Sequence, residues 1–259
     1  MGLTGVNVSD RLRLVARIVR LRPRAPRDRV TAWSQFWTGV AGGRLTEPVL
    51  WEGRVDAEAV EHERRVAPWF TPGPVVLDVG CGTGWLTAAL ARSRGVAVGV
   101  DVAPDAVALA RRSHPGAARF EVADLTDLPT AARLHGDLGD CHVVVRGVLH
   151  VLPADQRRAL ARAVRVLLGD RGRLYLVETN VGGGNLDYLA AAGADAAGIP
   201  GPLAQAIQTL PRPGHFGPQE RAALFPATHW DLLADGAGRL GLASGPDVAA
   251  YWAVLQPHR

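Results

Sequence analysis

The chain has 259 residues, 47% of them hydrophobic, which is enough for one large domain with a small appendage. No apolar run approaches the roughly 20 residues that cross a bilayer, and the first residues lack a signal-peptide pattern, so the sequence predicts a cytoplasmic protein without a membrane span. The two cysteines, Cys81 and Cys141, are too few for a disulfide framework, and no metal site is expected.

The formal net charge of +4 is carried by arginine alone, because the chain has no lysine. Basic chains can bind nucleic acid, but arginine used throughout a chain says little about partners. Eight arginines lie between Arg11 and Arg29 beside a single acid, Asp28. Such runs are usually solvated faces, so the sequence disfavours a nucleic-acid partner without closing that alternative.

Residues 1–72 are predicted to form a helical cap or substrate lid. Three helical patterns fall in this segment, and Pro23 is predicted to end the first of them. The segment also holds four of the seven tryptophans, among them Trp33 and Trp37. These tryptophans are expected to fix the cap to the domain, to line a substrate pocket, or to do both.

Residues 73–259 are predicted to form an α/β domain in which short apolar strands alternate with helices. The predicted strands are, in chain order, 75–79, 96–100, 118–122, 141–145, 173–177, 230–233 and 251–255. Helices are predicted at about 85–93, 104–112, 154–168 and 218–225, and the glycine-rich segment 181–217 carries no predicted element. This order predicts a doubly wound, Rossmann-like, mainly parallel seven-stranded sheet with helices on both faces.

The stretch VVLDVGCGTGWLTAAL, residues 75–90, joins the first strand of this domain to its helix. Its G-x-G-x-G spacing differs from the G-x-G-x-x-G of dinucleotide sites. Asp78, directly before the turn, would repel a pyrophosphate but suits a ligand that carries an ammonium group. A P-loop is excluded because it requires lysine.

LDVGCGTG closely resembles motif I of the class I S-adenosylmethionine-dependent methyltransferases, and the later segments VGVDVAPDAVALA, FEVADLTDLP, VVVRGVLHVLP and RVLLGDRGRLYLVET resemble the motifs that follow it. The resemblance spans residues 75–179 and implies that S-adenosylmethionine is the cofactor. It implies acidic contacts to the ribose from Asp101 and to the adenine amino group from Asp124. The full set of cofactor residues that it implies is Asp78, Gly80, Gly82, Gly84, Asp101, Val102, Asp124, Leu125 and, by position, Arg146.

His150 is the first candidate for a catalytic base, since it lies in the loop that faces the methyl group in this family. An ordinary pKa near 6.5 suits histidine to this task. His215, in the Gly- and Pro-rich sequence RPGHFG, is a second candidate. Val151 stands where many family members carry another histidine, so a pocket-lining or capping role for His150 stays open.

Three residues at strand ends are candidates for other contacts. Arg146 ends an apolar strand, where a charge needs a partner, and it is expected to reach the cofactor carboxylate or to pair with an acid such as Asp78. Glu178 and Asn180 leave the next strand on the ligand side and are substrate candidates.

The acceptor is expected to be a small, fairly apolar organic molecule that is methylated at oxygen or nitrogen. The aromatic cap favours an apolar molecule, and the lack of an Asn/Asp-Pro-Pro-Tyr motif after residue 145 disfavours the methylation of base amino groups in DNA. Biosynthesis of a specialised metabolite is the setting that this analogy suggests. Methylation of RNA or another macromolecule, and cofactor binding without methyl transfer, remain alternatives. The oligomeric state is open, a homodimer included.

Overall fold

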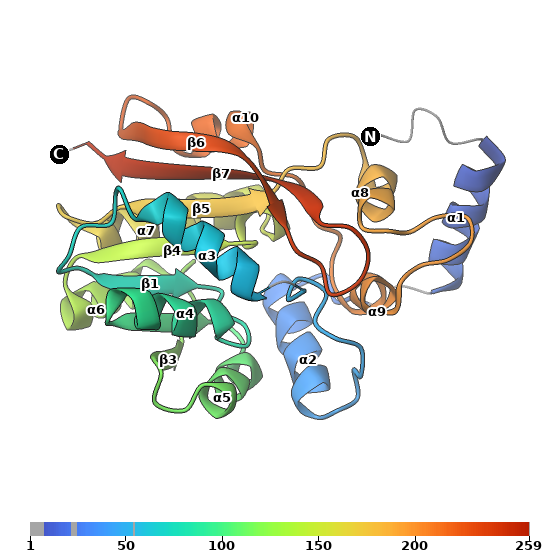
Figure 1. Cartoon of the computed structure of the whole chain (residues 1–259), viewed down its shortest axis with the longest axis horizontal. Helices are drawn as coiled ribbons and strands as arrows, with labels where there is room; N and C mark the ends of the chain where they lie inside the picture. Colours follow the sequence, from blue (N-terminus) through green and yellow to red (C-terminus); the bar gives the residue numbers. More distant parts are fainter. Residues whose placement is uncertain (1–7, 22–24, 54, 259) are drawn as a thin grey trace.

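A single seven-stranded sheet organises the chain, of which the computed structural model describes residues 8–21, 25–53 and 55–258. The strands run in the order β3-β2-β1-β4-β5-β7-β6 (Figure 1). Their bounds are β1 Val75–Val79, β2 Ala97–Asp101, β3 Arg119–Val122, β4 Cys141–Arg146, β5 Leu174–Thr179, β6 Trp230–Leu240 and β7 Val248–Pro257. β1 to β5 pair in parallel, whereas β7 is antiparallel to both of its neighbours.

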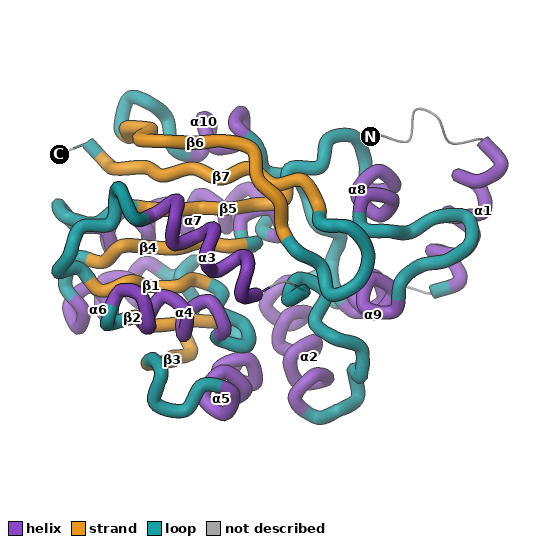
Figure 2. The backbone as a smooth tube through the Cα atoms, viewed as in Figure 1, coloured by secondary structure: helices purple, strands orange, loops and turns teal. Residues whose placement is uncertain are grey.

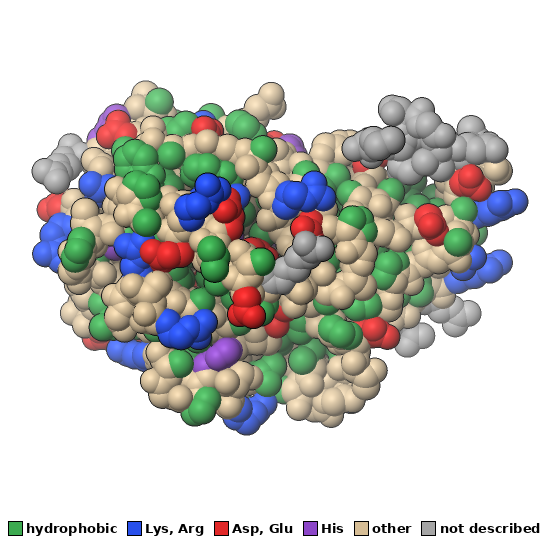
Figure 3. Space-filling view, viewed as in Figure 1, with side chains coloured by type: hydrophobic (Ala, Val, Ile, Leu, Met, Phe, Trp, Pro, Cys, Tyr) green, Lys and Arg blue, Asp and Glu red, His purple; other side chains and the backbone are tan. Residues whose placement is uncertain are grey.

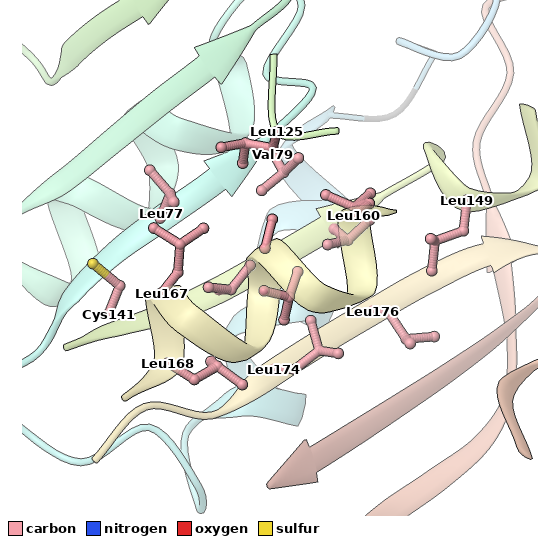
Figure 4. Packing of buried hydrophobic residues seen from close by; sticks show 14 of the residues in the cluster. Leu77, Val79, Leu125, Cys141, Leu149, Leu160, Leu167, Leu168, Leu174 and Leu176 are labelled. Atoms are coloured by element: carbon pink, nitrogen blue, oxygen red, sulfur yellow. The ribbon is translucent and has the colours of Figure 1, made fainter. Parts of the chain in front are cut away.

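Helices cover both faces of the sheet, as the buried strands require. On one face lie α6 (Leu128–Leu138), α7 (Ala154–Leu168) and α10 (Pro218–Leu224), whose apolar side chains share one core with β1, β4 and β5. Figure 4 shows this packing, with Leu160, Leu167 and Leu168 of α7 directed at the strands. The other face carries α3 (Val55–Val66) and α4 (Trp85–Arg94), and α5 (Pro104–Ser113) packs beside β2 and β3.

Four further helices lie beyond the carboxyl ends of the parallel strands (Figures 1 and 2). They are α1 (Val8–Arg20), α2 (Arg29–Ala41), α8 (Asn185–Ala191) and α9 (Gly201–Thr209), and together we call them the cap. Hydrogen bonds join segments that are far apart in sequence: Arg17 donates to the carbonyl of Ala196 at 3.0 Å, and Gln208 to that of Leu21 at 3.2 Å. The cap therefore combines residues from before β1 with residues between β5 and β6.

The predicted α/β architecture is confirmed, including the doubly wound, mainly parallel seven-stranded sheet. Three helices, α6, α8 and α9, were not predicted, and α8 and α9 lie in the segment assigned no regular structure. α8 and α9 have only 7 and 9 residues, and helices this short depend on tertiary packing, here within the cap, for most of their stability. Pro23, the predicted end of the first helix, lies outside the described residues.

The last two strands are longer than predicted, and for the edge strand β6 the reason is that most of its residues are not buried. β6 has 11 residues and β7 has 10, and only Trp230 and Leu240 at the two ends of β6 are buried. A strand at the edge of a sheet needs no continuous apolar run. Gly236 and Gly238 also interrupt its pattern, so the sequence signals only its first residues.

The face of the molecule in Figure 3 carries arginine and acidic side chains interspersed, with several basic residues over α1. Leu12 and Val19 of α1 are largely exposed. Within the described ranges, no helix is both long and apolar enough to pass through a membrane.

Candidate active site

A cavity of about 440 Å³ lies between the carboxyl edge of the sheet and the cap. Its floor comes from the turn after β1 and the ends of β2 and β4, and its roof from α2, α8 and α9. The adjacent strands β1 and β4 lead to opposite faces of the sheet, and ligands of doubly wound sheets bind where the strand order reverses in this way. The volume lies in the range of small-molecule sites.

The glycine turn after β1 forms the floor of the cavity because side chains would not fit there. Gly80 has φ +73°, and a Cβ on it would lie 2.6 Å from a methyl group of Val148. Gly82 has φ +53°, and a Cβ would lie 3.2 Å from the ring of Trp37 in α2. The third glycine, Gly84, is the N-cap of α4 in a left-handed conformation. Only glycine adopts these angles readily, and the turn thereby keeps its backbone open toward the cavity.

The three predicted acids lie on the cavity wall at the ends of β1, β2 and β3. Asp78 accepts a hydrogen bond from the hydroxyl of Thr87 at 2.6 Å. Asp101 accepts from the backbone N–H of Gly82 at 3.1 Å, so it also fixes the glycine turn. Asp124 accepts from the backbone N–H of Thr126 at 2.8 Å. Val102 and Leu125, the two apolar residues predicted beside these acids, line the same part of the cavity.

His150 lies in the short 3-10 helix Leu149–Val151 and is oriented by Glu178. The carboxylate of Glu178 accepts from His150 Nδ1 at 2.6 Å and from the backbone N–H groups of Val148, Leu149 and His150 at 2.8–3.1 Å. Because Nδ1 donates its proton, Nε2 of the neutral ring is an acceptor. Nε2 lies 3.4 Å from the Thr179 hydroxyl, and both residues line the cavity.

Glu178 was expected to contact the substrate, but its position in the structure is different. Its side chain is fully buried, and it does not line the cavity. Four donors surround the carboxylate, and charge-assisted hydrogen bonds of this kind are among the strongest in proteins. The position makes Glu178 a residue that orients His150.

Arg146 lines the cavity, but its partner is Glu58 of α3 and not Asp78. Two hydrogen bonds join Arg146 to the carboxylate, at 2.5 and 2.9 Å, and its guanidinium lies 5.2 Å from the centre of the Trp85 ring. Burial alone would raise the pKa of Glu58, but Arg146 and His62 lower it to about 2. The sequence could not indicate this partner, since 88 residues separate the two side chains.

The remaining predicted residues fall in two groups. Trp33 and Trp37 line the cavity, and they also pack with Phe36 and Trp51 in one aromatic cluster. Asn180 and His215 lie outside the cavity lining. Asn180 faces Gly217, and His215 is 45% exposed with Nε2 at 3.4 Å from Glu220.

The polar side chains of the cavity wall that were not predicted include Glu52, Arg29, Tyr188 and Arg212. Glu52 is hydrogen-bonded to Thr83 of the glycine turn at 2.8 Å, and burial raises its pKa. Burial also raises the pKa of Tyr188 to about 12. These residues belong to the cap or to the loops beside it, and none of them is part of a recognised sequence motif. The only sequence signal for their place in the cavity wall is that they lie close to the tryptophans or to the glycine-rich segment.

Residues 76–170 match a family described as a methyltransferase domain. Two curated relatives are each 32% identical to part of the chain: an O-methyltransferase from Pyrenophora dematioidea over 103 residues, and a magnesium-protoporphyrin O-methyltransferase from Rhodobacter capsulatus over 105 residues. These matches cover 38% and 39% of the chain and 36% and 46% of the relatives, so the chain spans less than half the length of either.

The similarity to one solved structure extends over nearly the whole chain. A S-adenosylmethionine-dependent methyltransferase from Anabaena variabilis superposes with a TM-score of 0.79 at 25% identity, and the match covers 91% of this chain and 98% of that one. By this domain match and by its fold, the chain is similar to the class I S-adenosylmethionine-dependent methyltransferases. This agrees with the resemblance found in the motifs, and it implies a cofactor of the S-adenosylmethionine type.

The side chains and backbone of the cavity fit a cofactor of this type. The glycine turn leaves a cradle that a Cβ would fill, with acids at the ends of three neighbouring strands. Asp78 is fully buried, and burial raises its pKa to about 6. An ammonium group placed beside it would favour the ionised form.

The raised pKa of Asp78 predicts a pH-dependent cost to stability in the ligand-free protein. The folded-state pKa of about 6 exceeds the ordinary value of 3.8, so the stabilising contribution of the protonated carboxyl is complete below pH 3.8 and is lost as the pH rises through 6. Replacing Asp78 by Asn removes this loss and keeps an acceptor for Thr87. The unfolding free energy of Asp78→Asn relative to wild type should therefore rise by about 2.5 kcal/mol between pH 4 and pH 8.

Urea unfolding of both proteins across this range checks the prediction. Groups other than Asp78 titrate alike in the two proteins and cancel in the difference. A difference that stays constant from pH 4 to pH 8 would show that folding does not raise the pKa of the Asp78 carboxyl.

Proposed function

We propose that the protein transfers a methyl group from S-adenosylmethionine to a hydroxyl or amino group of a small, fairly apolar acceptor. The observation that carries this proposal is the continuity of one cavity. Its floor holds the glycine turn and three acids, its roof is apolar, and His150 lies on the wall between Gly147 and Val151. A cofactor and an acceptor bound in one cavity can react directly.

The cofactor half is supported by the hydrogen-bonding capacity of its side chains. Asp101 keeps free lone pairs beyond its bonds to Gly82 and Ala103, and these can accept from two ribose hydroxyls. Asp124, Leu125 and Asp78 line the same cavity, and we assign the first two to the adenine ring and Asp78 to the ammonium group of the cofactor. When bound, the cofactor supplies a methyl group already activated on a sulfonium.

His150 then serves as the general base for a hydroxyl acceptor. Nε2 takes the proton of the hydroxyl while the oxygen forms its bond to the methyl carbon and the carbon–sulfur bond breaks. The resulting imidazolium is stabilised by Glu178, which accepts from Nδ1 at 2.6 Å. We assign this role to His150 in preference to His215, whose exposed ring faces Glu220 outside the cavity lining.

The acceptor half is supported by its apolar lining. Leu189 of α8, Leu203 and Ile207 of α9 and Trp33 of α2 all face the cavity. We propose that residues 1–72, together with α8 and α9, act as the substrate lid of a methyltransferase domain formed by residues 73–259. A cytoplasmic enzyme of specialised biosynthesis is the setting that this lining favours. Methyl transfer to RNA that is lost on deletion of residues 1–29 would support the macromolecular alternative instead.

Removal of the Asp101 carboxylate is predicted to weaken cofactor binding. Asp101→Ala should reduce the affinity for S-adenosylhomocysteine by about 1–3 kcal/mol, since charge-assisted hydrogen bonds to the ribose are lost. Isothermal titration calorimetry measures this change. Asp137→Ala, which removes an exposed carboxylate of α6, is the matched control and should leave the affinity unchanged. Equal affinity in Asp101→Ala and wild type would remove Asp101 from the cofactor site.

Loss of His150 is predicted to slow methyl transfer while the cofactor still binds. His150→Ala should lower kcat about 10²–10⁴-fold for a hydroxyl acceptor, which is the usual contribution of a positioned base. Transfer of a radiolabelled methyl group to a panel of phenols and aliphatic alcohols supplies the readout. His215→Ala is the control and should keep wild-type turnover. Undiminished turnover in His150→Ala, or its loss in His215→Ala, would contradict the assignment.

A further inference from the structure

The charged side chains that line the cavity are separated by sign. The acids are Glu52, Asp78, Asp101 and Asp124. All four belong to the glycine-turn side, where Glu52 bonds to Thr83 and Asp101 to Gly82. In the part of the cap that the structure describes, no Asp or Glu lines the cavity from α1, α2, α8, α9 or the loop 211–213. The acceptor side is therefore free of negative side chains.

The basic residues of the cavity wall are Arg146, Arg29 and Arg212. Arg146 is neutralised by Glu58, through the two hydrogen bonds described above. Neither Arg29 nor Arg212 forms a salt bridge with any residue in the described ranges. Two positive charges without acidic partners are thus left on the wall of the acceptor half.

Both arginines lie near the turn that carries His150. Arg29, the first residue of α2, donates through Nη1 to the carbonyl of Val151. Arg212 belongs to the loop that is tied to the same turn, because the N–H of Gly214 donates to the carbonyl of His150 at 2.7 Å. Arg29 uses one nitrogen in its backbone contact, which leaves other N–H donors of its guanidinium for a ligand.

The surroundings of Arg29 favour an anion. The side chain is half-buried, and its pKa is lowered first by burial and then by the neighbouring guanidinium of Arg157. Arg157 itself bonds to the carbonyl of Leu152 at 2.9 Å. Arg157 is attracted by the carboxylates of Glu178 and Glu220, whereas Arg29 is repelled by Arg157 and has no carboxylate partner in the described ranges, so an anion bound at Arg29 would relieve that repulsion.

We propose that the acceptor carries a carboxylate, bound by Arg29 and Arg212, on an apolar body that packs against the cap. The guanidinium fork matches the two oxygens of a carboxylate. The acids of the cavity then face the positively charged cofactor, and the arginines face the negatively charged acceptor. This inference rests on the proposed function, since it concerns the acceptor of that reaction.

Binding of a matched pair of aromatic probes tests the proposal without turnover. 2-Naphthoate and 2-naphthamide have the same ring and nearly the same shape, but only the first carries a charge. In the presence of saturating S-adenosylhomocysteine, calorimetry should show that 2-naphthoate binds about 10-fold or more tightly than 2-naphthamide. Arg212→Gln should weaken 2-naphthoate about 3- to 10-fold and leave 2-naphthamide unchanged, and adding Arg29→Gln should abolish the preference.

Two controls keep the result specific. Arg158→Gln removes an exposed charge of α7 outside the cavity lining and should preserve the preference for 2-naphthoate. In the part of the chain that the structure describes, the Arg212 side chain forms no hydrogen bond to the turn that carries His150, whereas Arg29 does. Arg212→Gln therefore tests the charge even if Arg29→Gln disturbs that turn. Equal affinity of wild type for the two probes, or equal weakening of both by Arg212→Gln, would overturn the proposal. A preference for 2-naphthoate without any methyl transfer would count against the proposed function alone.

Discussion

The carboxylate of Glu178 sets the geometry of the site more than any other side chain. It is fully buried at the end of β5, and it accepts four hydrogen bonds from the segment Val148–His150 that follows β4. A buried carboxylate is stable only when donors surround it, so the loop after β4 has little freedom to move. The same contact decides which nitrogen of His150 faces the cavity.

The parallel sheet brings these groups together from distant parts of the sequence. β1, β2, β4 and β5 all end at the same edge, and each contributes a charged side chain there: Asp78, Asp101, Arg146 and Glu178. Such a concentration of buried charge is costly unless every group has a partner. Asp78 accepts a hydrogen bond from Thr87, and Asp101 accepts one from the backbone of the glycine turn. Arg146 donates to the carboxylate of Glu58.

The cap divides the cavity into two chemical halves. On the floor, hydrogen-bonded acids and an open backbone suit a polar, positively charged cofactor. On the roof, apolar side chains of α2, α8 and α9 meet Arg29 and Arg212. Trp37 belongs to both, since it packs against Gly82 and also joins the aromatic cluster of the cap. The aromatic residues therefore both hold the cap and line the cavity.

The sequence locates the glycine turn and the neighbouring acids correctly because their signals are local. A strand that ends on an acid, followed by glycines at alternate positions, already defines the turn from Asp78 to Gly84. The acceptor half depends on contacts between distant segments, which one sequence does not reveal. Glu58 as the partner of Arg146, Glu178 as the partner of His150, and α8 and α9 as part of the cap all follow from tertiary packing.

The orientation of His150 by Glu178 is the central claim, and the tautomer of His150 tests it most directly. Nitrogen-15 NMR of protein labelled at histidine distinguishes a protonated Nδ1 from a protonated Nε2, and His150→Gln identifies the signal. The structure predicts that neutral His150 carries its proton on Nδ1, and that Glu178→Gln changes this tautomer population. A proton on Nε2 in the wild-type protein would contradict the account.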